Sequence, residues 1–141
     1  MGSTRFPGKP LCDLAGKPMV QWVVEAALAS GVSHDVVVAT PDPEIVEACH
    51  AFGARAMLTS AAHETGTDRI AEVSHALEAD VYVNVQGDEP LLRPESIADC
   101  ARPLLEDAGV QMGSVYCACP ENEVDEPTVV KVVTDGAGDA L

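Results

Sequence analysis

Residues 35–58 read DVVVATPDPEIVEACHAFGARAML and contain the pattern that decides the fold. The segment Asp35–Thr40 is a short, nearly all-apolar and β-branched run, which is typical of a parallel strand covered on both faces. Asp42 can cap a following helix that has a proline in its first position, and Gly53 lies just past the end of that helix. Arg55–Leu58 then predicts a second strand. This order of strand, helix and strand with short connections indicates a βαβ unit.

The same alternation continues on both sides of this unit. Helical spacing of apolar residues predicts helices at 17–30, 68–78 and 94–107, in the last of which Pro103 can break the helix. Further strands are predicted at Val81–Val85, Met112–Cys119 and Thr128–Thr134. We therefore expect an α/β protein, a three-layer α/β/α sandwich with a mostly parallel, Rossmann-like sheet. Residues 1–141 would form one partial domain, because no strand precedes the opening loop and the chain closes as if another strand were beginning.

Composition excludes several classes of protein. A hydrophobic fraction of 47% against 22% charged residues supports a buried core rather than disorder. The formal net charge of −15 and the 4% aromatic content argue against nucleic-acid binding. No apolar run approaches the roughly 20 residues of a membrane span, and no signal-peptide pattern opens the chain, so we expect a cytoplasmic protein. The 5 cysteines are scattered and lack zinc-site spacing, which predicts reduced or incidental thiols.

The opening loop, Gly2-Ser-Thr-Arg-Phe-Pro-Gly-Lys9, concentrates positive charge in an acidic protein. Arg5, Lys9 and Lys17 are three of the 8 basic residues, and no acidic residue occurs before Asp13. Small residues let backbone N–H groups approach an anion, and fixed cations add to the attraction, so a polyphosphate is the natural partner. The spacing is not that of a Walker loop. An ordinary basic surface turn is the alternative.

A second candidate segment is Val81-Tyr-Val-Asn-Val-Gln-Gly-Asp-Glu-Pro90. A carboxylate directly after a buried strand lies at the carboxyl edge of the sheet, where α/β proteins bind ligands. One such carboxylate can be the protein's share of a Mg²⁺ site whose other ligands are substrate phosphates. We choose Asp88, because Gly87 allows the chain to bend and present it. The alternative is a turn-forming aspartate that binds its own backbone.

The third segment, Thr65-Gly-Thr-Asp68-Arg69, is a capping-box-like helix start with small residues that leave N–H groups open to an anion. Arg69 in the first turn opposes the helix dipole, which becomes sensible if the arginine faces a nucleotide phosphate. The alternative is a surface arginine paired with Glu64 or Glu72. No Ser–His–Asp set and no pair of hydrolytic carboxylates is evident.

Taken together, these segments resemble the 3-deoxy-manno-octulosonate (Kdo) cytidylyltransferases. The resemblance runs over essentially the whole chain in the right order. Its matching strings are Ser3–Leu11 (STRFPGKPL), Gly16–Met19 (GKPM), Thr65–Arg69 (TGTDR), Val83–Pro90 (VNVQGDEP) and Val129–Val133 (VVKVV). The first and fourth strings are specific in combination, although each alone is moderately so.

The resemblance implies transfer of a cytidylyl group from CTP to Kdo, with release of pyrophosphate, for lipopolysaccharide synthesis. It assigns the triphosphate grip, and with it nucleotide binding, to the opening loop, and a nucleotide or phosphate contact to the helix-start arginine. It places Mg²⁺ on an aspartate and a nucleotide or sugar contact on a glutamine. On this chain the nucleotide-binding residues are Ser3, Thr4, Arg5, Lys9, Arg69 and Gln86, the metal ligand is Asp88, and Arg5, Lys9 and Asp88 are the catalytic group.

The chain also departs from the family pattern. The family has an apolar strand before the opening loop, and its C-terminal part supplies most of the sugar site, a second metal aspartate and much of the dimer surface. The resemblance therefore implies a homodimer for the full-length protein and little activity for these residues alone. Two alternatives stay open: a relative that uses another sugar, such as an amino-Kdo, and a non-catalytic nucleotide-binding module.

Overall fold

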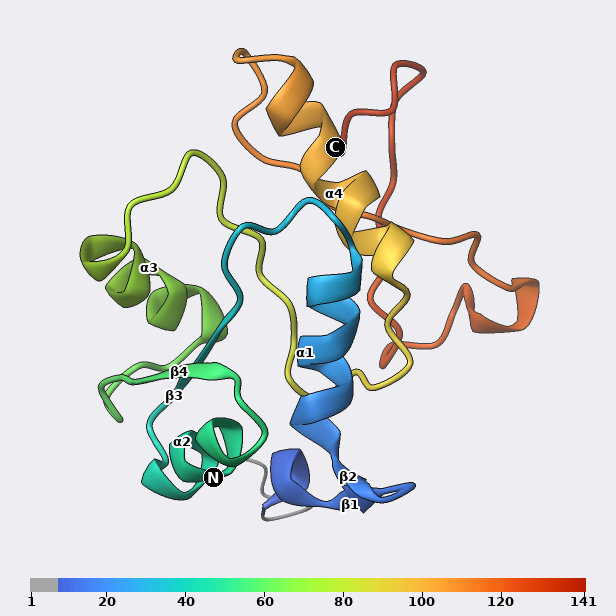
Figure 1. Ribbon diagram of the computed structural model, residues 1–141. Coiled ribbons are helices and arrows are strands. Elements are labelled where there is room, and N and C mark those ends of the chain that lie inside the picture. Colours follow the sequence, from blue (N-terminus) through green and yellow to red (C-terminus); the bar gives the residue numbers. More distant parts are fainter. Residues whose placement is uncertain (1–7) are drawn as a thin grey trace.

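The computed structural model describes residues 8–141 (Figure 1). Four α-helices account for most of the regular structure of that part of the chain: α1 Met19–Ala29, α2 Pro43–Ala51, α3 Gly66–Ala76 and α4 Pro94–Glu106. The strands are β1 Asp13–Leu14, β2 Lys17–Pro18, β3 Val37–Thr40 and β4 Arg55–Leu58, and two 3₁₀ turns are η1 Lys9–Leu11 and η2 Glu121–Glu123. None of the helices in residues 8–141 has the length and apolar character that crossing a bilayer requires.

The predicted βαβ unit is present. Strands β3 and β4 pair in parallel, with Val37 opposite Arg55 and Thr40 opposite Leu58. Helix α2 connects them and contacts both strands, and α3 contacts β3 from the other side in the view of Figure 1. Gly53, two residues beyond α2, has a φ of +81°, a left-handed conformation that glycine adopts without a side-chain clash. The first expected strand begins two residues later than predicted, at Val37.

The main core lies where α1 and α2 meet this small sheet. Val20 and Val24 of α1 pack with Ile45 and Cys49 of α2, and all four side chains are at most 5% exposed. Leu11 of η1 packs against the same cluster. The first turn of the described chain is thus fixed to the core by its own apolar side chain.

The predicted capping box of α3 is confirmed. The Thr65 hydroxyl accepts from the backbone N–H of Asp68 at 3.1 Å, and the Asp68 carboxylate accepts from the N–H of Thr65 at 3.1 Å. Helix α4 runs through Pro103 without the break that the proline suggested. Because Pro103 lies three residues before the last helical residue, the helix loses one backbone hydrogen bond only near its end.

Three strand predictions are wrong. Residues 81–85, 112–119 and 128–134 form no β-ladder in the structure, and Thr134 alone makes an isolated bridge, with Ala140. The first of these segments still alternates, with Val81, Val83 and Val85 half-buried and the residues between them exposed. A strand needs a neighbouring backbone about 4.8 Å away, and no described segment supplies one here. The paired strands are therefore β3 with β4 and the separate hairpin of β1 with β2.

Candidate nucleotide site

Two of the three predicted segments meet at an ion pair between Lys9 and Asp88. The Lys9 ammonium donates to Asp88 Oδ2 at 2.6 Å, across 79 positions of sequence. Both side chains are part-exposed, at 34% and 46%. A ligand arriving from solvent can therefore reach the cation and the carboxylate together.

Local structure presents each of these side chains. Gly8, with a φ of +75°, turns the chain into η1, so that Lys9 opens the turn while Leu11 enters the core. On the other side, the N–H of Glu89 donates to the carbonyl of Gln86 at 3.3 Å, which closes a turn over Gly87 and Asp88. The expected bend is present at this point, although Gly87 itself does not adopt a left-handed φ.

The third segment approaches the same place through Gln86. Gly66, the first residue of α3, lies so close to Gln86 that a Cβ added there would be 3.7 Å from Gln86 Nε2. Gln86 also donates to Asn84 Oδ1 at 3.4 Å, a long contact that leaves most of its amide available. The turn at residues 86–89 thus lies between the Lys9 turn and the start of α3.

Arg69 is held by the loop before α3. Its Nη1 donates to the buried hydroxyl of Thr59 at 2.5 Å and to the carbonyl of Ser60 at 3.0 Å. Among the described residues no direct ion pair joins Arg69 to Glu64 or Glu72, although the charge of Arg69 helps to lower the pKa of Glu72. The guanidinium fixes the loop against the helix, and a phosphate contact by its remaining N–H groups stays a prediction.

Three of the predicted residues, Ser3, Thr4 and Arg5, lie outside the described residues. Lys17, counted in the sequence as part of the cationic opening, is directed elsewhere. Its ammonium binds both carboxylate oxygens of Glu25, at 2.8 and 2.7 Å. The local excess of positive charge therefore comes from fewer residues than the composition suggested.

The donor set at Asp88 fits one kind of metal site. Within residues 8–141 no three His, Cys, Asp or Glu side chains are grouped so that they could hold a metal ion. A transition-metal cage needs three or four protein ligands, whereas Mg²⁺ takes one or two carboxylates together with substrate phosphates. Asp88, exposed and close to a lysine that can bind phosphate, suits the second arrangement.

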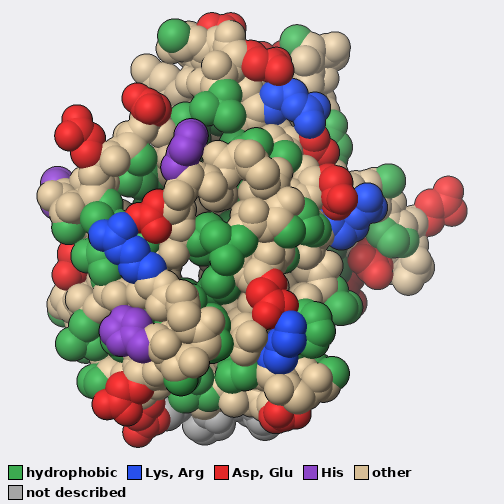
Figure 2. Space-filling view, in the orientation of Figure 1, with side chains coloured by type: hydrophobic (Ala, Val, Ile, Leu, Met, Phe, Trp, Pro, Cys, Tyr) green, Lys and Arg blue, Asp and Glu red, His purple; other side chains and the backbone are tan. Residues whose placement is uncertain are grey.

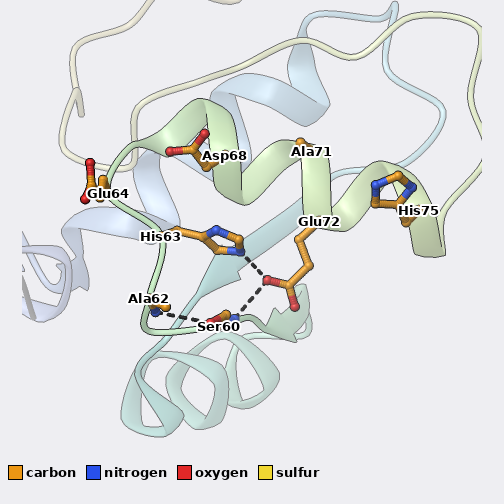
Figure 3. Close-up of a pocket in the computed structure, with 8 residues that line it drawn as sticks. All are labelled: Ser60, Ala62, His63, Glu64, Asp68, Ala71, Glu72 and His75. Carbon is orange, nitrogen blue, oxygen red and sulfur yellow. Dashed lines mark hydrogen bonds and ion pairs between the residues drawn. The ribbon is translucent and has the colours of Figure 1, made fainter.

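A separate hollow lies along α3 and the loop before it (Figure 3). It has a volume of about 730 Å³ and is open to solvent. Its lining residues are Ser60, Ala62, His63, Glu64, Asp68, Ala71, Glu72 and His75. Three carboxylates among these residues make the hollow unfavourable for a triphosphate, because like charges repel.

Hydrogen bonds within this hollow keep two of its carboxylates ionised. The backbone N–H of Ser60 donates to Glu72 at 2.9 Å, His63 makes a short contact with the same oxygen, and together they lower the pKa of Glu72. The Thr65 hydroxyl lowers the pKa of Asp68. The His63–Glu72 network was not predicted, and its sequence signal, a histidine nine positions before a glutamate across a loop, is too weak to find it.

Charge on the visible face of the molecule is mixed. Figure 2 shows each patch of lysine or arginine on that face next to an acidic side chain.

The chain matches the family model described as cytidylyltransferase over residues 1–141. It is 51% identical to a 3-deoxy-manno-octulosonate cytidylyltransferase of Geobacter metallireducens, and the match covers 99% of this chain and 55% of that protein. A 3-deoxy-manno-octulosonate cytidylyltransferase of Escherichia coli is 45% identical, with 99% and 57% covered. The chain thus spans a little over half the length of these curated relatives.

A solved structure gives the corresponding comparison of shape. A CMP:2-keto-3-deoxy-manno-octonic acid synthetase complexed with CTP superposes with a TM-score of 0.91 at 43% identity, covering 99% of this chain and 58% of that one. A nucleotidyl transferase from Methanothermobacter, 22% identical with a TM-score of 0.58 over 67% of this chain, shares the fold.

Proposed function

This chain belongs to the cytidylyltransferase family, and from that premise we propose that the protein transfers a cytidylyl group from CTP to Kdo and releases pyrophosphate. The observation that carries the proposal is the ion pair of Lys9 with Asp88, which brings the cationic opening turn and the aspartate of the 81–90 segment to one place. Relatives that match 99% of this chain, and that are nearly twice as long, are named for the same reaction.

The proposed reaction requires the protein to bind both substrates and to stabilise the negative charge that develops during the transfer. A hydroxyl oxygen of the sugar attacks the α-phosphorus of CTP, the bond to the pyrophosphate oxygen breaks, and the hydroxyl proton passes to solvent or a base. Negative charge grows on the phosphate oxygens and on the departing pyrophosphate. When bound, Mg²⁺ would neutralise part of that charge. Lys9 would leave Asp88 for the phosphates, and Asp88 would then be free to hold the metal.

The nucleotide contacts are proposed as follows. Ser3, Thr4 and Arg5 precede Lys9 and would complete the triphosphate grip with backbone N–H groups and a guanidinium. Gln86, which lies beside the start of α3, would contact the nucleotide or the sugar. Arg69 would offer a phosphate the N–H groups that the loop does not use.

The proposal extends to the complete fold, the compartment and the partners of the protein. In a protein of the relatives' length, the parallel β3–β4 pair with helices on two sides would be part of a three-layer α/β/α sandwich with a Rossmann-like sheet. All five cysteines are free thiols, which suits a reducing compartment such as the cytoplasm. CTP and Kdo would be its substrates, the product would enter lipopolysaccharide synthesis, and the full-length enzyme would be a homodimer.

Calorimetric titration of CTP with and without Mg²⁺, on the chain and on Asp88→Asn, tests the nucleotide half of this proposal. We expect Mg²⁺ to raise the CTP affinity of the parent chain. With Mg²⁺ present, Asp88→Asn should bind CTP about tenfold or more weakly than the parent. Without Mg²⁺, Asp88→Asn should bind CTP at least as tightly as the parent, because Lys9 then has no competing carboxylate. Asp80→Asn, at the other end of the 81–85 segment, is the matched control.

CTP binding that is indifferent to both Mg²⁺ and Asp88 would favour a non-catalytic binding module. The acceptor half needs a protein of the relatives' length, in which pyrophosphate release is measured with Kdo and with other 2-keto sugar acids. No release with any of them would contradict the proposed reaction, and release with a different acid alone would change the sugar.

A further inference from the structure

The GKPM string at residues 16–19 has no role in the proposed chemistry, yet it lies in a dense cluster of contacts. Lys17 reaches back over α1, where its ammonium binds both oxygens of Glu25, at 2.8 and 2.7 Å, and sits 4.4 Å from the ring centroid of Trp22. Two carboxylate contacts and an aromatic face occupy the ammonium, so Lys17 is not free to bind phosphate.

The other strand of the hairpin is held from the same helix. The Trp22 indole N–H donates to the carbonyl of Leu14 at 2.7 Å. Gln21 donates to Glu25 Oε1 at 3.0 Å and orients the carboxylate. Glu25 lies three residues after Trp22 and four after Gln21, so its side chain neighbours both of theirs on the surface of α1. Helix α1 thus holds β1 through the backbone carbonyl of Leu14 and β2 through the side chain of Lys17.

The hairpin is continuous with the turn that presents Lys9. The N–H of Cys12 donates to the carbonyl of Lys9 at 3.1 Å, and the N–H of Met19 donates to the carbonyl of Cys12 at 3.0 Å. The loop residues Ala15 and Gly16 both have positive φ, +54° and +88°, as a tight two-residue hairpin turn requires. A shift of the hairpin is therefore passed to Lys9 within a few residues.

We propose that Glu25, Lys17 and Trp22 are positioning residues for nucleotide binding: they fix the β1–β2 hairpin to α1 and thereby hold Lys9 at the site it shares with Asp88. This inference rests on the proposed function for its ligand. Leu11 anchors the inner side of the η1 turn in the core, and the cluster fixes the hairpin that follows it. The two together determine where the Lys9 ammonium lies.

The test is Glu25→Gln, which removes the charge and keeps the size and helix preference of the side chain. Glu47→Gln, an exposed position on α2, makes the same charge change away from the cluster. Three quantities are measured: the CTP dissociation constant with Mg²⁺, the exchange rates of the Leu11, Cys12 and Met19 amides, and the emission of Trp22, the single tryptophan.

Glu25→Gln should weaken CTP binding about threefold to fivefold, as loss of a part-exposed ion pair does, while Glu47→Gln leaves it unchanged. The three amides should exchange faster and Trp22 emission should shift, at a melting temperature close to that of the control. In the double variant Lys17→Gln/Glu25→Gln, CTP binding should be weakened no more than in the more affected single variant, since both changes break one contact.

Affinity and amide exchange equal to those of Glu47→Gln would overturn the inference. If the parent chain fails to bind CTP while Glu25→Gln still releases the three amides, the proposed function is contradicted and the positioning of the turn is upheld. If Glu25→Gln loses CTP binding and its melting temperature also falls well below that of Glu47→Gln, the cluster has a general structural role and the inference is overturned.

Discussion

Residues 36–58 and 107–141 both contain runs of valine, but the two regions use them differently. Val36, Val37 and Val38 are half-buried in and beside a paired strand that α2 covers, whereas Val130 is 98% exposed and Val133 68% exposed. In Figure 1 the second region is a set of loops beyond α4. Both regions are within the 99% of the chain that superposes on the CTP-complexed synthetase. Valine runs therefore favour an extended backbone in both regions, but a strand is paired and buried only where another strand and a helix lie beside it.

The sharpest test of this contrast compares two apolar truncations. Ile45→Ala removes a side chain that is 5% exposed at the centre of the core and should lower the free energy of unfolding by about 2–5 kcal/mol. Val130→Ala should change it by less than about 0.5 kcal/mol. Urea denaturation followed by circular dichroism measures both. A large effect of Val130→Ala would show that the 107–141 region is packed in solution, and the contrast would disappear.

A second test compares two threonines in similar local motifs. Thr65 exchanges hydrogen bonds with Asp68 at the start of packed helix α3, and Thr128 donates to Glu126 at 3.0 Å in a loop. Thr65→Ala should destabilise the chain by about 1 kcal/mol, as loss of a helix cap does. Thr128→Ala should leave the thermal midpoint almost unchanged. Equal shifts in the midpoint would mean that both regions unfold as one unit.

The smallest expected effect concerns two carboxylates whose pKa values are lowered by backbone N–H groups. Ser60 and then His63 lower the pKa of Glu72, and Ala137 and Asp139 lower that of Asp135. A lowered pKa in the folded state stabilises the fold above the unfolded pKa, about 4, and this stabilisation is lost as the pH falls through the folded value.

Carbon-detected NMR titrations in rising urea follow the two groups separately. Asp135 should return to its ordinary pKa at a lower urea concentration than Glu72, because fewer packed contacts protect its loop. A simultaneous return of both groups would contradict separate stabilities for the two regions.

The elements that could be predicted from sequence are those with local causes. The cap at Thr65, the proline that opens α2 and the glycine after it act within a few residues, and the βαβ unit formed as expected. Pairing of residues 81–85, 112–119 and 128–134 depends on distant backbone, and alternation alone could not reveal it. The β1–β2 hairpin was missed because Ala15-Gly16 is a weaker turn signal than Asn-Gly.

The candidate site was predictable in outline. Placing Asp88 after an extended segment put it near the opening turn, and the ion pair with Lys9 agrees with that prediction. The role of Lys17 could not be predicted, because its charge looked the same in the sequence as that of Lys9. The two lysines differ only in the folded structure: Glu25 and Trp22 of α1 contact Lys17, which fixes the hairpin, whereas Lys9 faces solvent.

The Lys9–Asp88 contact also has a consequence for synthesis of the protein. Closing a loop of 79 residues costs about 4 kcal/mol of chain entropy, more than an exposed ion pair returns. The contact therefore exists because the core has already brought its ends together. On the ribosome, the proposed triphosphate site would be incomplete until residue 88 had emerged and the valines of α1 had packed against α2. Nucleotide binding would then report that the core of α1 and α2 has formed.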